Sequence, residues 1–282
     1  MKLLRWGPPG AEKPGILDAK GVIRDLSGVV PDIAGDTLSP AGLAKLAGFD
    51  ATSLPAVPAG VRLGPCVAGM KNFVCIGLNY ADHAAETGAP IPKEPIIFMK
   101  SLGAVVGPND DVKIPRGSKK TDWEVELGVV IGTKASYVSE ADALNHVAGY
   151  CVVNDVSERE YQIERGGTWD KGKGCDTFGP TGPWMVTKDE VADPQNLDMF
   201  CEVDGKRYQD GNTRTMIFGV VKLVSYVSHF ITLHPGDVIS TGTPVGAGVR
   251  FDPPRYLAPG DLVEVEVPGI GTLANTVADE PA

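Results

Sequence analysis

The run Trp123-Glu-Val-Glu-Leu-Gly-Val-Val-Ile-Gly132 places two acidic residues inside an otherwise apolar stretch. Side chains of a β-strand alternate between two faces, so Glu124 and Glu126 point to one face while Val125 and Leu127 point to the other. Two adjacent carboxylates near a core repel each other and lose hydration, which is costly unless a cation or a proton compensates. The alternative is an edge strand whose acidic face lies in water, and this run alone does not decide between the two.

A second apolar run, residues 148–155, ends in a third acidic residue, Asp155. Three convergent carboxylates, in a chain with only four histidines, suit a hard divalent cation that prefers oxygen ligands. The pattern therefore indicates a site for Mg²⁺ or Mn²⁺.

Length and composition limit the class of protein. The chain has 282 residues, of which 43% are hydrophobic and 22% charged, as is ordinary for a globular protein. Its 35 glycines and 23 prolines indicate many turns, as in a β-rich fold. A formal net charge of −10 without a cluster of Lys and Arg argues against nucleic acid and anionic membranes as partners.

The sequence also bears on location. No apolar run reaches the roughly 20 residues that span a bilayer, and residues 1–10 lack the apolar centre of a signal peptide. The five cysteines, at positions 66, 75, 151, 175 and 201, show no CxxC spacing and indicate reduced, mostly buried thiols. We therefore expect a cytoplasmic protein.

Residues 1–65 are predicted to form a small N-terminal domain. It contains a hairpin over residues 16–26 with its turn at Lys20-Gly21, and a short helix capped by Ser39 with Pro40 as its first residue. The proline-rich residues 54–65 are typical of a linker or an extended crossing segment.

The remaining residues, 66–282, show mostly short strands separated by turns. The pattern predicts an α+β fold, mostly β, with a largely antiparallel β-roll or sandwich and a few helices. Helices are predicted over residues 79–86 and 215–233, where apolar residues recur at helical spacing. Strands are predicted over residues 73–77, 96–98, 103–106, 123–131, 146–153, 199–203, 237–241 and 262–267.

The first predicted helix of this region carries His83 and Glu86, three residues apart and so on one helical face. A carboxylate bonded to one imidazole nitrogen fixes the tautomer and raises the basicity of the other nitrogen, as a general base acting on water requires. An ordinary surface His–Glu pair would have the same spacing.

A polar turn after Asp155 brings Arg159 and Gln162 near the acidic residues. A guanidinium group is the preferred partner of a substrate carboxylate, although a solvated helix face would have the same composition. Lys173 lies among glycines in residues 169–180, which the sequence predicts to be an exposed loop. This lysine either reaches a ligand or is a plain surface residue.

A predicted strand over residues 237–241 runs into the glycine-rich turn that contains Thr243. Small residues allow backbone N–H groups and threonine hydroxyls to approach an anion closely. The segment lacks the GxGxxG pattern and the amphipathic helix of a dinucleotide site.

Six short motifs follow one another between residues 72 and 248. They are Gly77-x-Asn79-Tyr80-x-x-His83-x-x-Glu86, Ile97-Phe98-x-Lys100, Trp123-Glu124-x-Glu126-Leu127, Asn154-Asp155-x-Ser157-x-Arg159, Lys173-Gly-x-Asp176 and Gly236-Asp237-x-Ile239-x-Thr241-Gly242-Thr243-Pro244. Each is modest alone, but together and in this order they resemble the fumarylacetoacetate hydrolase family, in its branch of acylpyruvases and 2,4-diketo-acid hydrolases.

The resemblance implies a fumarylacetoacetate-hydrolase-like mixed β-roll or sandwich, with residues 66–282 as the catalytic domain, and a homodimer. It implies that Mg²⁺ or Mn²⁺ is bound by Glu124, Glu126 and Asp155. The implied reaction splits the C–C bond of a 2,4-dioxo acid into pyruvate and a second acid. The site residues implied for it are the water-activating dyad His83 and Glu86, the catalytic Lys173, and Arg159, Gln162 and Thr243 against the 2-oxo acid substrate.

One position departs from this branch, because many acylpyruvases carry an arginine where this chain has Leu78. The missing cation and the acidic net charge favour a neutral, hydroxylated tail, as in a 2,4-diketo-3-deoxy sugar acid from carbohydrate breakdown. Neutral groups of Asn79, Tyr80 or Thr243 are the expected partners of its hydroxyls.

Two rival functions stay open. Decarboxylases, isomerases, hydratases and lyases of the family share the same metal chemistry, and the chain could also be a metal-binding module without turnover. The dyad of His83 and Glu86 argues against a decarboxylase and a binding module, because neither has to activate water.

Overall fold

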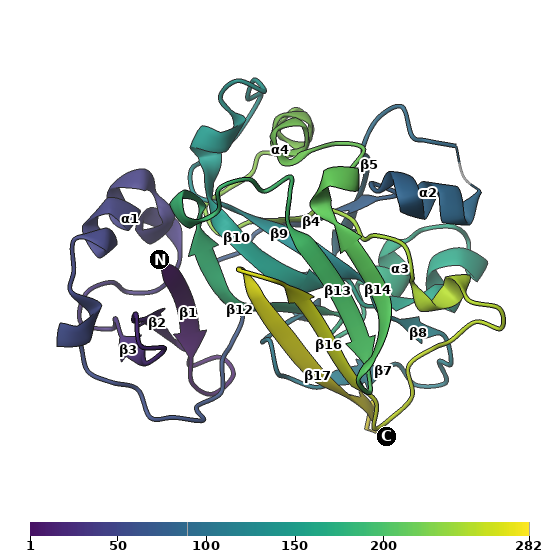
Figure 1. Ribbon diagram of the computed structural model, residues 1–282, viewed down its shortest axis with the longest axis horizontal. Helices are drawn as coiled ribbons and strands as arrows, with labels where there is room; N and C mark the ends of the chain where they lie inside the picture. The colour runs from purple at the N-terminus through teal and green to yellow at the C-terminus, as the bar shows by residue number, and fades with distance from the viewer. Residues whose placement is uncertain (89, 282) are drawn as a thin grey trace.

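The computed structural model describes residues 1–88 and 90–281. A large mixed β-sheet runs through the molecule, and a second sheet packs on one of its faces (Figure 1). The strands of the large sheet lie in the order β3-β2-β1-β12-β10-β9-β15-β4-β5, with β6 paired to β12. Their bounds are β1 Lys2–Trp6, β2 Lys13–Leu17, β3 Ile23–Asp25, β4 Phe73–Gly77, β5 Ile96–Lys100, β6 Val105–Val106, β9 Val125–Ile131, β10 Val147–Asn154, β12 Gly179–Thr187 and β15 Val238–Ser240.

The second sheet has the strand order β14-β13-β16-β17-β7, and a short separate pair joins β8 to β11. The bounds are β7 Val112–Ile114, β8 Thr121–Asp122, β11 Ser157–Glu158, β13 Asp198–Val203, β14 Lys206–Asn212, β16 Leu262–Val267 and β17 Gly271–Asp279. Most neighbours are antiparallel, but β15 with β4, β12 with β6 and β17 with β7 run parallel. The predicted mostly-β, mixed-sheet fold is therefore confirmed.

The alternation in β9 decides what each face of that strand contacts. Val125, Leu127 and Val129 belong to the core between the two sheets, together with residues of β13, β16 and β17. Val130 instead joins a second core, which lies between the large sheet and the N-terminal residues. Glu124 and Glu126 lie on the same side as Val130, so the predicted shared face is confirmed.

The helices are α1 Pro40–Ala47, α2 Ala81–Thr87, α3 Asp170–Lys173 and α4 Val220–Ser228, and a π-helical turn covers Glu160–Glu164. The predicted N-terminal hairpin is confirmed, since β2 and β3 pair through Leu17 and Ile23. The predicted cap is confirmed as well, because the Ser39 hydroxyl accepts a hydrogen bond from the Gly42 N–H.

The predicted helix over residues 215–233 is wrong at both ends. α4 covers only its middle because tertiary partners hold the flanks: the Phe218 N–H donates to the Asn79 side chain, and Leu233 pairs with Ala135 as an isolated bridge. The sequence prediction also omitted strands β1, β7, β8, β11, β12, β14 and β17. β1 pairs with β12, so N-terminal residues extend the large sheet, and the domain boundary at residue 65 stays a prediction.

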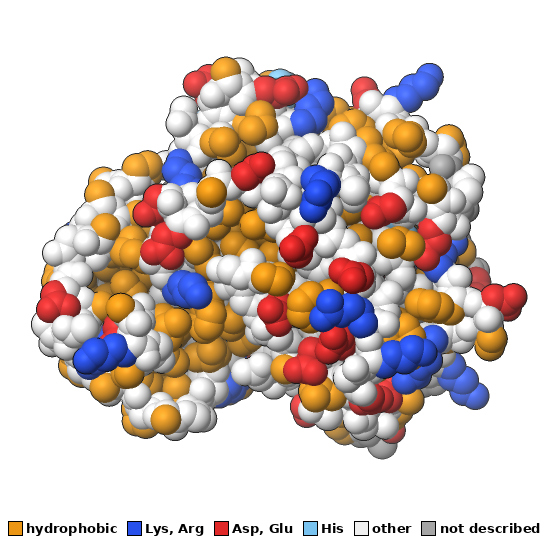
Figure 2. All heavy atoms as spheres, viewed as in Figure 1, with side chains coloured by type: hydrophobic (Ala, Val, Ile, Leu, Met, Phe, Trp, Pro, Cys, Tyr) orange, Lys and Arg blue, Asp and Glu red, His pale blue; other side chains and the backbone are white. Residues whose placement is uncertain are grey.

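The surface in Figure 2 carries acidic and basic side chains that are interspersed rather than sorted into fields. Hydrophobic side chains gather on this face in the region of β1 and β12, beside the N-terminal residues. Among the helices of the described residues, none is long and apolar enough to cross a membrane.

Candidate active site

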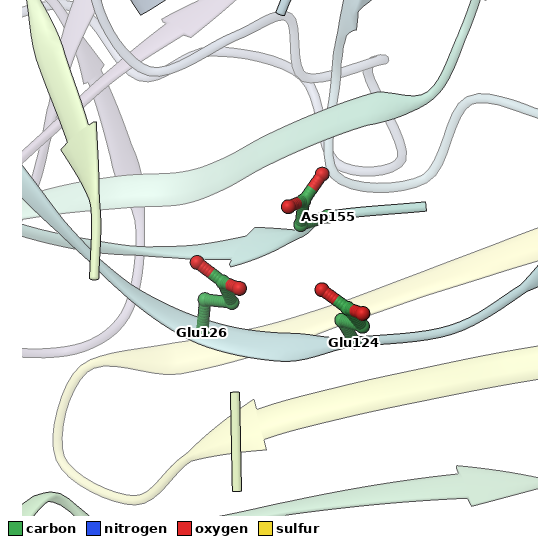
Figure 3. A group of neighbouring side chains, drawn as sticks. All are labelled: Glu124, Glu126 and Asp155. Atoms are coloured by element: carbon green, nitrogen blue, oxygen red, sulfur yellow. The ribbon is translucent and has the colours of Figure 1, made fainter. Parts of the chain in front are cut away.

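The three predicted metal-binding carboxylates meet where β9 and β10 lie side by side. Asn154 pairs with Val125 across the two strands, and the Asp155 N–H donates to the Glu124 carbonyl at 2.9 Å. One carboxylate oxygen from each of Glu124, Glu126 and Asp155 lies within 4.8 Å of the others. Figure 3 shows the two glutamates rising from one side of a strand toward Asp155.

This geometry rules out the edge-strand alternative. β9 lies between β10 and β15 in the large sheet, and the three acidic residues are between 0% and 7% exposed. Glu126 accepts hydrogen bonds from the Ser240 hydroxyl at 2.5 Å and from the Gly242 N–H at 2.8 Å. Of the two arrangements that the sequence left open, the structure therefore has the costly one, in which the carboxylates are gathered away from water.

Buried cations compensate part of this charge. The Lys173 ammonium lies 2.8 Å from a Glu124 oxygen and 2.8 Å from an Asp155 oxygen. Lys100 approaches the other Asp155 oxygen to 2.5 Å. Arg159 bonds Glu124 at 2.7 Å. The predicted exposed loop around Lys173 is therefore wrong, since this residue ends helix α3 and is 2% exposed.

The buried cations compensate the charge of Glu124 much more than that of Glu126. Burial tends to raise the pKa of Glu124, but Lys173 and Arg159 outweigh it and lower that pKa to about 2. For Glu126, burial and the charges of Asp155 and Glu124 act in the same direction and raise its pKa well above the ordinary value. The ammonium of Lys173 already lies between two of the three carboxylates, and Glu126 has no ion pair among the described residues. The donor set therefore fits a divalent cation with oxygen ligands.

Lys173→Met is expected to lower the free energy of unfolding of the metal-free protein by about 3 kcal/mol, because it removes one of the two cations that pair with each of buried Glu124 and Asp155. Added Mn²⁺ should then raise the melting temperature of this variant more than that of the wild type, since the ion no longer competes with an ammonium. Differential scanning fluorimetry with and without Mn²⁺ measures both effects. Lys171→Met, at an exposed lysine of the same helix, is the control. A rise no larger than that of the wild type would contradict the shared site.

The predicted dyad is formed. His83 and Glu86 lie on α2, and the imidazole Nδ1 is 3.1 Å from a Glu86 oxygen. The Gly246 N–H also approaches Glu86, at 3.3 Å, which ties α2 to the glycine-rich turn. His83 is 8% exposed and lines the same cavity as Glu124 and Glu126. With Nδ1 directed at a carboxylate, Nε2 is left as the basic nitrogen.

A cavity of about 370 Å³ lies between the acidic residues and the dyad histidine. Its polar lining includes His83, the two glutamates and Lys173, and its apolar wall includes Ile76, Phe98, Ile163, Trp169 and Val249. Gly77 is needed at this wall because a Cβ there would overlap the Trp169 ring. A small anionic ligand with an apolar portion fits such a mixed lining.

The predicted substrate-binding residues all line the cavity, but their polar atoms are largely engaged by the protein. Arg159 bonds Asp122, Glu124 and the side-chain oxygen of Gln162. The Thr243 hydroxyl donates to the Val125 carbonyl and accepts from Gln209. Their roles as substrate contacts stay predictions.

Two of the proposed partners for a substrate hydroxyl are not available. Asn79 and Tyr80 are fully buried and outside the cavity lining. The Asn79 amide bonds the backbone of Phe218 and Thr241, and the Tyr80 hydroxyl donates to the sulfur of Met199. The prediction that they recognise a hydroxylated tail is wrong, because both side chains hold neighbouring elements together.

Three residues of the site were absent from the predicted set. Lys100 belongs to the motif Ile97-Phe98-x-Lys100, which was the available signal for it. Asp122 precedes the acidic strand and holds Arg159, and Arg250 lines the cavity from the short 3₁₀ helix Gly248–Arg250. Neither of the last two has a sequence pattern that sets it apart from an ordinary surface charge.

Comparison with known proteins agrees with this geometry. The model of the fumarylacetoacetate (FAA) hydrolase C-terminal family matches residues 72–278. This range includes the dyad and the three carboxylates of Glu124, Glu126 and Asp155, which we call the triad. The chain belongs to this family. A Burkholderia multivorans protein, whose name is no more specific than hydrolase, is 64% identical over 272 residues, covering 96% of each chain.

Two solved structures of family members show the range of related chemistry. A Mycobacterium abscessus protein named as a probable 2-hydroxyhepta-2,4-diene-1,7-dioate isomerase superposes with a TM-score of 0.84 at 33% identity. The maleylpyruvate hydrolase of Sphingobium sp. SYK-6, in complex with manganese(II) and pyruvate, superposes with a TM-score of 0.82 at 26% identity. Each covers the whole of both chains. The family therefore accommodates both a hydrolase and an isomerase on this fold.

Proposed function

We propose that the protein is a divalent-metal-dependent hydrolase that cleaves the C–C bond of a 2,4-dioxo acid and releases pyruvate. The observation that carries the proposal is His83, which is bonded to Glu86 and lines the same cavity as Glu124 and Glu126 of the buried carboxylate cluster. Hydrolysis needs both a base for water and a cation near the leaving enolate. The manganese and pyruvate bound to the maleylpyruvate hydrolase add support by similarity.

A divalent cation held by Glu124, Glu126 and Asp155 would supply the positive charge that stabilises the enolate of pyruvate. His83 accepts the proton of a water molecule at Nε2, and Glu86 steadies the charge that the imidazole gains. The oxygen of that water bonds to the carbonyl at C4 of the substrate and stays in the second carboxylic acid. The bond between C3 and C4 breaks with its electron pair leaving on C3 as the enolate, which takes the proton back from the His83 imidazolium to give pyruvate.

The surrounding residues hold this arrangement in place. Lys100 and Arg159 orient Asp155 and Glu124, while Phe98 and Trp169 pack edge to face beside the cavity. Fixed charges within an apolar wall act at low effective dielectric, where they are stronger than in water.

A second candidate is an isomerase or decarboxylase of the same family, favoured by the isomerase among the structural neighbours. Both reactions proceed through an enolate but need no attacking water. A base fixed by a carboxylate in the cavity favours the hydrolase.

Pyruvate release from a panel of 2,4-dioxo acids, followed with a coupled dehydrogenase, tests the proposal. We expect turnover with Mg²⁺ or Mn²⁺ and its loss in excess chelator, with recovery when the ion is restored. Oxaloacetate and 2-hydroxyhepta-2,4-diene-1,7-dioate serve as substrates for the rival reactions. Full activity in chelator, or turnover of the rival substrates alone, would refute the metal-dependent hydrolase.

The sequence favoured a hydroxylated 2,4-diketo-3-deoxy sugar acid as substrate, and the structure weakens both reasons for it. Asn79 and Tyr80 do not reach the cavity, and Thr243 keeps only acceptor capacity. Leu78 does line the cavity, but so does the cation of Arg250. The homodimer and the cytoplasmic location stay predictions from sequence.

A further inference from the structure

The cavity lining contains three permanently charged cations, and they differ in what they contact. Arg159 and Lys173 are buried and are paired with carboxylates of the protein. Arg250 is exposed, and within residues 1–88 and 90–281 its guanidinium shows no hydrogen bond or ion pair. Its charge at the cavity is therefore available to a ligand.

The backbone that carries Arg250 is held rigidly against the site. Buried Asp122 accepts hydrogen bonds from the Gly248 N–H at 2.7 Å and the Val249 N–H at 3.0 Å. The same carboxylate bonds Arg159 at 2.7 Å, and Arg159 in turn pairs with Glu124, so Asp122 links this segment to the acidic residues through Arg159. A Cβ at Gly248 would overlap the Arg255 carbonyl oxygen, so the close approach requires glycine.

We infer that Arg250 binds a second carboxylate, at the end of the substrate remote from its 2-oxo acid group. The inference rests on the proposed function and deepens it: the substrate is a dicarboxylic 2,4-dioxo acid. A chain with a net charge of −10 disfavours a dianion unless a local cation receives it. A guanidinium fork matches a carboxylate with two parallel hydrogen bonds.

The apolar wall agrees with this assignment. Ile163 and Val249 line the cavity together with Arg250, and Trp169 lies in the same lining. These groups suit the carbon atoms between the two acid groups. A substrate with a carboxylate at each end and an apolar middle matches a lining that combines the acidic residues Glu124 and Glu126, an apolar wall and the unpaired cation of Arg250.

The test compares two ligands that differ only in the remote group, 2-oxoadipate and 2-oxohexanoate, by calorimetry in the presence of Mn²⁺. The wild type should bind the diacid roughly tenfold more tightly, as expected for a partly solvated charge-assisted pair. Arg250→Met should remove this preference and leave the affinity for 2-oxohexanoate within about twofold, and Arg250→Lys should keep part of it. Arg207→Met, at an exposed arginine outside the cavity lining, controls for the change in net charge.

Equal losses for both ligands in Arg250→Met, or no loss for either, would overturn the assignment. The same variants are then compared on fumarylpyruvate and acetylpyruvate, where Arg250→Met should reduce kcat/KM for fumarylpyruvate alone. The two proposals fail separately. If the wild type turns over no 2,4-dioxo acid, the hydrolase is refuted, while the calorimetric comparison still decides whether Arg250 reads a carboxylate.

Discussion

Glu124→Gln and Glu126→Gln make the same chemical change two residues apart, yet they should shift the stability of the metal-free protein in opposite directions. Glu124 is paired with Lys173 and Arg159, so its neutralisation removes one of the two carboxylate partners of each buried cation and should cost about 3 kcal/mol. Glu126 is opposed by neighbouring carboxylates, and its raised pKa shows that the charged form is disfavoured. A neutral amide there should leave stability unchanged or raise it by up to about 1 kcal/mol.

Both variants should nevertheless lose turnover and most of the stabilisation by Mn²⁺, because each removes one carboxylate of the triad. Chemical denaturation with and without Mn²⁺, together with pyruvate release, measures all three effects. Glu140→Gln, at an exposed glutamate outside the cavity lining, is the matched control. If Glu126→Gln destabilised the metal-free protein as much as Glu124→Gln does, the assigned imbalance of charge would be wrong.

His83→Ala should lower kcat for 2,4-dioxo acid hydrolysis by at least about 10²-fold, the usual contribution of a general base. Glu86→Gln should cost less, because the amide oxygen can still accept the Nδ1 proton but no longer stabilises the imidazolium charge. Stabilisation by Mn²⁺ should be unchanged in both variants, since neither side chain belongs to the triad.

The same variants separate the hydrolase from its rivals. Decarboxylation of oxaloacetate, if the protein performs it, should survive His83→Ala because it needs no attacking water. His146→Ala, at a histidine outside the cavity, is the control. Hydrolysis that proceeds at the wild-type rate in His83→Ala would eliminate the dyad.

Local pattern was enough to predict several parts of the fold and site. The two-residue period placed Glu124 and Glu126 on one face, and the three-residue spacing placed His83 beside Glu86. The helix cap by Ser39 was predicted from the type of residue that stands directly before the helix. Each of these relations is local in sequence, so backbone geometry alone determines it.

Contacts between segments that lie far apart in the sequence could not be predicted from local patterns. Asn79 lies two residues before α2 and bonds the backbone of Phe218, two residues before α4, so one side chain ties together the starts of two helices. Lys173 looked exposed among glycines, yet the fold buries it between two carboxylates that lie 49 and 18 positions earlier in the chain. Solvation and pairing of a charge depend on what other elements bring near it, and no local spacing records that.

The sequence by itself thus determined which residue types could bind a metal ion and activate water, because strand and helix periods are local properties. Only the tertiary structure decided which charges are already paired. It joins Arg159 to Glu124 and Asp122, and leaves Arg250 unpaired at the cavity among the described residues. Electrostatic complementarity acts through space, so the cations free to meet a substrate are known only when every carboxylate around them has been placed.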